Sequence, residues 1–409
     1  MEAQLLRANT NLKNRKHIVT YVYDDKLASS TNKIPNIRDR ARITHELIRS
    51  YGLTDQMNWI SSEAATFEDL KVFHSSSYVD FLAACNTSEG HQNHGDESDS
   101  GSDRTDDEIN VDSQEFQNEH KLTDEDFGLG YDCPIFKNMG DFARVIAGGT
   151  LTACREILNG NLIAINWCGG WHHAQRDQAG GFCTVNDIVL GCHLLQKKFP
   201  KILYIDLDAH HGDGVENAFS LTRNILTFSM HIREPGYYPG TGSIDDIGIG
   251  RGKYHVVNVP LKSYVSDYQF FNTFDRVLSS IVDVFHADAV IVQCGVDFIS
   301  GDPVGKGNLT EKGLGQCVAR VMELKLPTLF LGGGGYNQRN SAKCWAYLTS
   351  LITGVSISSD IPEHDNFLLF GPDFDLGITA SPVKSQNTNE YLDSVVSQIK
   401  GNLKNLKDI

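Results

Sequence analysis

The chain has 409 residues, of which 40% are hydrophobic and 22% are charged. This ordinary composition excludes a collagen-like or a wholly disordered chain. No segment approaches the roughly 20 consecutive apolar residues that a membrane-spanning helix needs. Residues 1–16 are polar and basic and lack the apolar centre of a secretory signal. We therefore expect a soluble intracellular protein that does not bind membranes.

The net charge of −16 is concentrated in one short segment. Residues 87–126 contain fourteen Asp and Glu against Arg104 and Lys121, so they carry −12 and leave only −4 for the other 369 residues. The segment is rich in Ser, Asn and Gln and poor in large apolar residues, which predicts a disordered surface insertion. The rest of the chain has no basic face, so we expect no direct binding to nucleic acid.

Short β-rich runs alternate with helical patterns along the chain. In chain order these are a strand at 17–23, helices at 38–51 and 142–159, a strand at 162–167, a helix at 186–199, strands at 201–208 and 225–231, a helix at 267–285, a strand at 289–294, a helix at 311–324 and a strand at 328–331. The alternation predicts an α/β fold with an open, mostly parallel sheet flanked by helices. We expect one domain over 17–400, an extension over 1–16 and a short tail over 401–409.

Four of the predicted strands run directly into polar or glycine-rich loops, which begin after residues 166, 205, 292 and 331. In open parallel sheets, ligands bind beyond the carboxyl ends of the strands. We therefore expect the four loops to meet at one active site.

Three aspartates and two histidines lie within eight positions of one of these loops: Asp206, Asp208, His210, His211 and Asp213. Alternate residues at a strand end share a face, and carboxylates that converge in an apolar sheet need a cation to offset their repulsion and desolvation. With Asp297 from another strand end, Asp208 and His210 would give three protein ligands and an open coordination position, as in catalytic zinc sites. A turn stabilised by Asp and Gly is the alternative for any single residue, but it does not account for all five.

The adjacent His172 and His173 lie on another of the four loops. A lone histidine is more often structural, but a tandem pair beside carboxylates indicates a general base and a general acid. Asp206 and Asp213, which the metal does not need, would each hold the far nitrogen of one imidazole.

Tyr336 follows four consecutive glycines, Gly332 to Gly335. The run lacks the pattern of a phosphate-binding loop, but glycines allow close backbone approach and would let Tyr336 project into the site. A phenol there would donate a hydrogen bond to a developing oxyanion; packing in the core is the alternative. Phe182 and Tyr238, on two other loops, would form a narrow slot for an aliphatic chain unless each simply packs in the core.

Seven motifs, in this order and spacing, resemble those of the class I zinc-dependent histone deacetylases. They are Trp171-His-His173, Gly181-Phe-Cys183, Asp206-Leu-Asp-Ala-His-His-Gly-Asp-Gly214, Pro239-Gly-Thr-Gly242, Cys294-Gly-Val-Asp297, Gly301-Asp-Pro303 and Gly332-Gly-Gly-Gly-Tyr336. The resemblance covers roughly residues 17–400. The chain ends soon after Leu403, without the long tail of most class I members, and in this it resembles the histone deacetylase 8 branch. It implies the arginase/deacetylase fold and removal of the acetyl group from N-ε-acetyl-lysine in histones and other proteins, with release of acetate.

The resemblance implies the same chemistry for the residues discussed above. Zinc would be bound by Asp208, His210 and Asp297, although Fe²⁺ also suits this ligand set. The acid/base pair would be His172 and His173, supported by Asp206 and Asp213. Tyr336 would polarise the acetyl carbonyl, and hydroxamate-type inhibitors are expected to bind.

The resemblance also implies a substrate tunnel and two structural potassium sites. The tunnel and its rim would comprise Asp132, Gly181, Phe182, Tyr238 and Val304. The first potassium ion would be bound by the backbone of Asp206, Asp208, His210 and Met230, together with Ser229. The second would be bound by Phe219, Thr222, Ile225 and His255.

The chain departs from the family pattern in ways that affect substrate preference. Tyr238 and Val296 stand where Phe and Ala are usual, and the acidic insertion enlarges the loop before Asp132. Val304 replaces the Glu of polyamine-selecting relatives, which argues against a cationic polyamine substrate. A nuclear and cytoplasmic chromatin regulator is the expectation.

Two other functions remain open from the sequence. An arginase-type ureohydrolase also clusters Asp and His at strand ends, but it holds two manganese ions and would need further ligands. An inactive acetyl-lysine reader or scaffold is the second alternative, and it conflicts with the presence of every predicted reactive group.

Overall fold

The computed structural model describes residues 19–85 and 123–408. The predicted extension over 1–16 and most of the predicted acidic insertion lie outside these residues. The described strands are β1 (Val19–Val22), β2 (Asn58–Ile60), β3 (Ile163–Asn166), β4 (Ile202–Asp206), β5 (Ile225–Ile232), β6 (Val256–Leu261), β7 (Ala289–Gln293) and β8 (Thr328–Leu331).

Within the described residues, the eight strands form one sheet in the order β2-β1-β3-β8-β7-β4-β5-β6, and every neighbouring pair is parallel. The strands other than β2 are buried along their whole length. Continuous aliphatic runs of this kind are typical of parallel strands covered on both faces. The predicted α/β fold is confirmed, and the sheet is parallel throughout.

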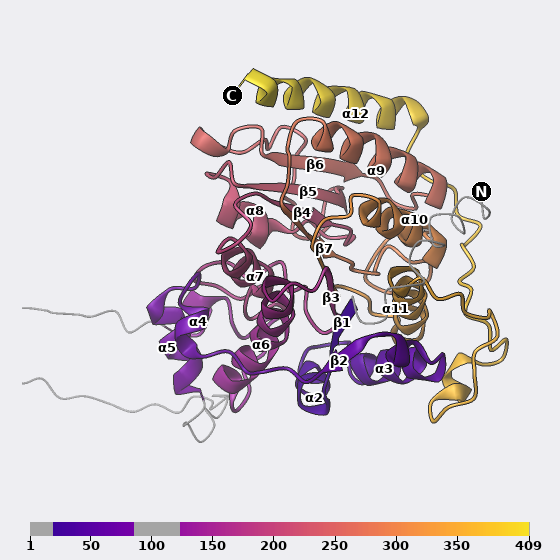
Figure 1. Cartoon of the computed structure of the whole chain (residues 1–409). Coiled ribbons are helices and arrows are strands. Elements are labelled where there is room, and N and C mark those ends of the chain that lie inside the picture. The colour runs from indigo at the N-terminus through magenta and orange to yellow at the C-terminus, as the bar shows by residue number, and fades with distance from the viewer. Residues whose placement is uncertain (1–18, 86–122, 409) are drawn as a thin grey trace, which may run out of the picture.

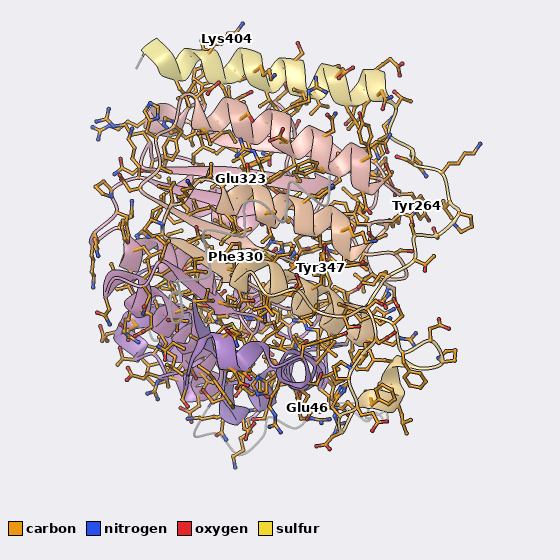
Figure 2. All side chains as sticks on the ribbon, turned by 45° about the vertical axis from the view of Figure 1, so that its right-hand side comes forward. Glu46, Tyr264, Glu323, Phe330, Tyr347 and Lys404 are labelled. Carbon is orange, nitrogen blue, oxygen red and sulfur yellow. The ribbon has the colours of Figure 1, made fainter. Side chains whose placement is uncertain are left out.

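Two layers of helices cover the sheet (Figure 1). One layer is a series of helices in which each packs on the next: α3 (Arg40–Ser50), α11 (Gln338–Thr353), α10 (Glu311–Met322), α9 (Asp267–Val282) and α12 (Asn389–Lys404). Figure 2 shows this layer from the front, with Glu46 on α3 and Lys404 on α12 marking its two ends. The other layer contains α6 (Met139–Leu158), α7 (Asp187–Leu195) and α8 (Asp213–Phe219).

Three shorter helices, α2 (Asp25–Thr31), α4 (Phe67–Leu70) and α5 (Ser76–Ala84), pack around α6. The short 3₁₀ helices are η1 (Leu53–Gln56), η2 (Glu125–Phe127), η3 (Gly250–Gly252), η4 (Phe367–Phe370) and η5 (Asn405–Asp408). No helix in the described ranges is both long and apolar enough to cross a membrane.

Side-chain caps fix the beginnings of two helices that follow the functional loops. Asn337 caps α11 by accepting from the Asn340 backbone N–H, and Asn186 caps α7 by accepting from that of Val189. These contacts satisfy amides that have no partner within the helix. The cap residues thereby set where each loop ends and its helix begins.

Candidate active site

The four polar loops meet at one edge of the sheet, as predicted. They follow β3, β8, β7 and β4, which are consecutive neighbours in the sheet. Because all strands are parallel, their carboxyl ends lie on the same side, and residues distant in sequence come together there.

Asp208, His210 and Asp297 form a buried cluster beyond the ends of β4 and β7. One potential ligand atom from each lies within 4.8 Å of the others, and this is the one such cluster of His, Cys, Asp or Glu in the described part of the chain. Gln293 Nε2 and the Gly334 backbone N–H each donate to Asp208 Oδ2 at 2.8 Å. These bonds orient the cluster without neutralising it.

The charge of this cluster fits a small divalent cation. Asp208 and Asp297 are 1% and 0% exposed. The basic side chain hydrogen-bonded to them is His210, whose Nδ1 lies 2.7 Å from Asp297 Oδ2. Burial and the neighbouring Asp208 carboxylate raise the pKa of Asp297 to about 7. That shift reflects the cost of packing two carboxylates together, which a bound dication would remove. Two carboxylates and one imidazole suit zinc and related ions.

The tandem histidines each have the predicted carboxylate partner. His172 Nδ1 lies 2.8 Å from Asp206 Oδ2, and His173 Nδ1 lies 2.8 Å from Asp213 Oδ1. The two imidazole centroids are 4.0 Å apart, and His172 Nε2 is 3.9 Å from Asp208 Oδ1. The pair therefore borders the ligand cluster directly.

The two imidazoles have different protonation behaviour. Burial favours neutral His172, but the carboxylates of Asp206 and Asp208 outweigh it and raise its pKa to about 9. Burial and the nearby charge of His172 lower the pKa of His173 to about 4. One ring is therefore charged and the other neutral near pH 7, as expected when the environments of two neighbouring groups differ.

The glycine run brings backbone against the ligand cluster and carries Tyr336 to its edge. A Cβ at position 334 would lie 2.4 Å from Asp297 Oδ2, so only glycine fits there. The Tyr336 backbone N–H donates to Asp302 Oδ2 at 2.6 Å, and Arg40 donates to the Gly335 carbonyl at 2.8 Å. Burial raises the pKa of Tyr336 well above its usual 10, so the phenol stays protonated.

The predicted aromatic residues lie around the histidines and Tyr336. The Phe182 ring packs edge-on against Tyr336, with 5.8 Å between centroids, and the Tyr238 ring packs edge-on against His173 at 5.0 Å. A Cβ at Gly181 would lie 2.3 Å from His173 Cδ2, so this glycine also contacts the site.

The other predicted rim residues hold positions on adjacent loops. Asp132 accepts a hydrogen bond from the Gly181 backbone N–H at 2.8 Å, which places it beside the glycine that contacts His173. The Val304 backbone N–H donates to Asp302, the residue that also anchors Tyr336.

The residues predicted for the first potassium ion are neighbours in the structure. Asp206 on β4 pairs in register with Ser229 on β5, Met230 follows it, and Asp208 and His210 continue from β4. For the second ion, Thr222 donates its backbone N–H to the Phe219 carbonyl, and the His255 carbonyl accepts from Thr227, two residues after Ile225. These contacts place Asp206 beside Ser229, Thr222 beside Phe219, and His255 near Ile225.

Several residues that support the site were not predicted as site residues: Arg40, Asn186, Asp187, Gln293 and Asp302. They bind backbone groups or ligands far along the chain, so no local spacing identifies them. Gln293 lay at the start of a polar strand-end loop and Asp302 in the motif Gly301-Asp-Pro303, and these were the available indications. Arg40, on α3, had none.

Comparisons with known proteins agree with this geometry. Residues 34–352 match the family model described as histone deacetylase domain. Histone deacetylase 8 of Danio rerio is 40% identical over 395 residues, which cover 96% of this chain and 97% of that protein. Histone deacetylase 8 of Xenopus laevis is 46% identical over 298 residues, covering 70% of this chain and 92% of that protein. Histone deacetylase clr6 of Schizosaccharomyces pombe is 38% identical over 394 residues, covering 96% and 90%.

These similarities extend over most of the chain and confirm the resemblance that the motifs indicated, including that to histone deacetylase 8. They decide against an arginase-type ureohydrolase, because the matching family model is that of the deacetylases. The chain belongs to the histone deacetylase family and is a lysine deacetylase, a hydrolase.

Proposed function

We propose that this site hydrolyses the acetamide of N-ε-acetyl-lysine with one zinc ion held by Asp208, His210 and Asp297. The observation that carries the proposal is the contact between this buried cluster and a tandem histidine pair, with His172 Nε2 3.9 Å from Asp208 Oδ1. When bound, the ion would act as a Lewis acid on the acetyl carbonyl and lower the pKa of an attacking water. Fe²⁺ suits the same ligands.

We assign His173 as the general base. Its lowered pKa keeps the ring neutral near pH 7, and Asp213 holds Nδ1, which leaves Nε2 to accept a proton from the attacking water. As the carbon–nitrogen bond breaks, that proton passes to the leaving lysine nitrogen. The charged His172, fixed by Asp206, would stabilise the negative charge that develops on the acetyl oxygen.

Tyr336 is assigned to the acetyl oxygen. Its phenol remains a hydrogen-bond donor at all ordinary pH values, and its backbone is held by Asp302. A donor fixed in advance stabilises a developing oxyanion without reorganisation during the reaction.

The proposed substrate enters between the aromatic residues. Phe182 and Tyr238 would flank the aliphatic part of the acetylated lysine, Gly181 would line the passage, and Asp132 and Val304 would contact the peptide at the rim. Their contacts with Tyr336, His173 and Gly181 support this arrangement. Acetylated histone tails and other acetylated proteins are the proposed substrates, and hydroxamates are the proposed inhibitors.

We further propose that potassium binds at the two predicted sets, with Asp206, Asp208, His210, Ser229 and Met230 in the first and Phe219, Thr222, Ile225 and His255 in the second. Asp206 and Asp213, the other two aspartates of this loop, are hydrogen-bonded to the tandem histidines rather than gathered with the ligand cluster, which supports one catalytic ion. We propose a role in chromatin and transcription regulation, in the nucleus and cytoplasm, without direct nucleic-acid binding.

An acetate-release assay on a panel of acetyl-lysine peptides tests this function. The zinc-loaded chain should release one acetate per deacetylated lysine, and a chelator should abolish release until zinc is restored. No release from any peptide, or release that a chelator leaves unchanged, would contradict the proposal. Urea formation from an arginine-like substrate would instead indicate ureohydrolase chemistry.

A further inference from the structure

The loop that carries the tandem histidines is held by a buried side chain from outside the ligand cluster. Asn186, which is 0% exposed, donates through Nδ2 to the His172 carbonyl at 3.3 Å and to the Ala174 carbonyl at 2.9 Å. Its Oδ1 accepts from the Val189 backbone N–H at 3.1 Å and so caps α7. One side chain therefore joins the start of a rigid helix to the backbone on both sides of His173.

The next residue fixes the beginning of the same loop. Asp187 accepts from the Gly170 backbone N–H at 3.0 Å and from the Trp171 backbone N–H at 2.8 Å. Thr150 on α6 donates its hydroxyl to the same carboxylate, so the carboxylate is itself held in place. Asp187 thus binds the N–H groups just before the histidine pair, and the adjacent Asn186 binds the carbonyls of His172 and Ala174.

His74, which precedes α5, fixes the far end of the loop. Its Nε2 accepts from the Asn186 backbone N–H at 3.0 Å, and its Nδ1 lies 3.2 Å from the Arg176 carbonyl. Burial lowers the pKa of His74 to about 4, so the ring is neutral near pH 7, and the proton on Nδ1 donates to that carbonyl. We name His74, Asn186 and Asp187 the loop bracket.

We propose that Asn186, supported by the other members of the loop bracket, is a positioning residue that holds His172 and His173 in register with Asp206 and Asp213. The inference rests on the proposed function, because it concerns the pair assigned as acid and base. In the hydrogen bonds described, the Asn186 side chain contacts neither a ligand of the proposed metal nor the substrate-facing Phe182 and Tyr238. Its effect should therefore be confined to the chemical step.

The substitution Asn186→Asp isolates this role. Aspartate has nearly the same size and keeps the oxygen that caps α7, but it cannot donate to the carbonyls of His172 and Ala174. Two carbonyls would then face a carboxylate oxygen instead of an amide, and the loop must shift to relieve the repulsion. A displacement of about 1 Å in a catalytic group can cost about 10²-fold in rate.

Steady-state kinetics and metal analysis of the zinc-loaded full chain test the proposal. Asn186→Asp should lower kcat by about 10²-fold, with KM and bound zinc close to those of the parent. Asn387→Asp is the matched control, because Asn387 is also buried and its Nδ2 donates to the Lys262 carbonyl at 2.7 Å. This bond joins the segment after β6 to the segment before α12. That control should lower thermal stability but leave kcat unchanged.

The outcomes separate the two levels of inference. If the parent chain releases no acetate, the proposed function fails. If the parent is active, three results for Asn186→Asp would show that the positioning role is wrong while the function stands. They are a kcat equal to that of the parent, loss of bound zinc, and a decrease in kcat no larger than that of Asn387→Asp. If Asn186→Asp does not fold, Asp187→Asn decides the question, because it places an amide against the Gly170 or Trp171 N–H and should lower kcat in the same selective way.

Discussion

At the scale of single residues, Tyr336 is fixed through its backbone and free to act through its phenol. The backbone N–H is bound by Asp302, and Arg40, whose guanidinium lies 4.7 Å from the centroid of the Trp345 ring, holds the preceding carbonyl of Gly335. Neither contact involves the hydroxyl. Removing that hydroxyl should therefore leave the loop in place.

Tyr336→Phe should lower the rate of acetate release by about 10²-fold or more, the effect of losing one oxyanion donor. Bound zinc should be unchanged, because Tyr336 is not a ligand. Tyr391→Phe is the control: it removes a phenol that donates to the Pro260 carbonyl on β6, away from the site, and should retain activity. Full activity in Tyr336→Phe would contradict the role assigned to its phenol.

Asp302 accepts four backbone N–H groups, those of Val304, Gly305, Tyr336 and Asn337. Asp302→Asn would turn one acceptor oxygen into a donor that faces N–H groups. We expect a loss of about 1–3 kcal/mol in the free energy of unfolding and a lower kcat, because Tyr336 would be less well held. Urea unfolding and acetate release check both, and a variant with unchanged stability and kcat would show that the four bonds are dispensable.

The sequence indicated the residues that meet at the candidate site better than the residues that hold them there. Asp208 and His210 lie two positions apart at a strand end, among five Asp and His residues within eight positions, and this pattern indicates a shared ligand site. Asn186 and Arg40 act on carbonyls of distant loops, so their role depends on the tertiary structure. Tandem histidines and alternate ligand positions can be recognised in the sequence, whereas a side chain that binds the backbone of a distant loop cannot.

At the scale of elements, the site depends on four adjacent strands and on loops that approach one another closely. The glycine loop between β8 and α11 packs its backbone onto Asp208 and Asp297. Gly334 does not adopt a left-handed backbone conformation, so steric contact alone requires glycine there.

Gly334→Ala should therefore weaken zinc binding, because the added Cβ would lie 2.4 Å from Asp297 Oδ2 and displace that carboxylate. A competition titration against a chelator measures the change in affinity. Gly401→Ala on α12 is the control, since a Cβ there meets nothing within 4 Å. It should leave zinc affinity unchanged and raise the free energy of unfolding by about 1 kcal/mol, the difference in helix propensity. Parent-like zinc affinity in Gly334→Ala would contradict the packing described here.

The two strands that the sequence did not predict are the edge strands β2 and β6. β2 has three residues, which is too short for a recognisable pattern. β6 contains Asn258 and Pro260. Because proline lacks the N–H that an interior strand needs, the sequence of this segment does not indicate a strand. As an edge strand β6 pairs on one side, which explains why proline is tolerated.

At the scale of the whole molecule, the stability of the fold should depend on pH through buried neutral histidines such as His74. Burial lowers its pKa to about 4, whereas a histidine in an unfolded chain titrates near 6.5. Between these values the unfolded chain takes up a proton that the folded chain does not. The contribution of neutral His74 is therefore complete above pH 6.5 and is lost as the pH falls towards 4.

Urea unfolding at several pH values, with chelator present, measures this contribution. The parent should lose more stability than His74→Gln between about pH 6.5 and 4, with a difference of up to about 3 kcal/mol. Comparing two chains removes the effect of the other titrating groups, including buried acids whose pKa values shift in the opposite direction. Parallel curves would show that His74 does not contribute.

The single parallel α/β domain could be predicted because strand and helix patterns alternate over the chain, and the structure confirms it for the described residues. The division into a 1–16 extension, an acidic insertion over 87–126 and a 401–409 tail stays a prediction. Residues 401–408 continue α12 into η5, and the sequence did not predict a helix in this region.

The proposed hydrolysis requires one divalent ion bound by Asp208, His210 and Asp297. Titrating zinc into the metal-free chain, while following bound zinc and acetate release, tests this requirement most directly. Acetate release should rise in proportion to bound zinc and saturate at one ion per chain, and Asp297→Ala should lose both. Full activity without metal, saturation at two ions, or an Asp297→Ala variant that binds zinc and turns over like the parent would contradict this requirement.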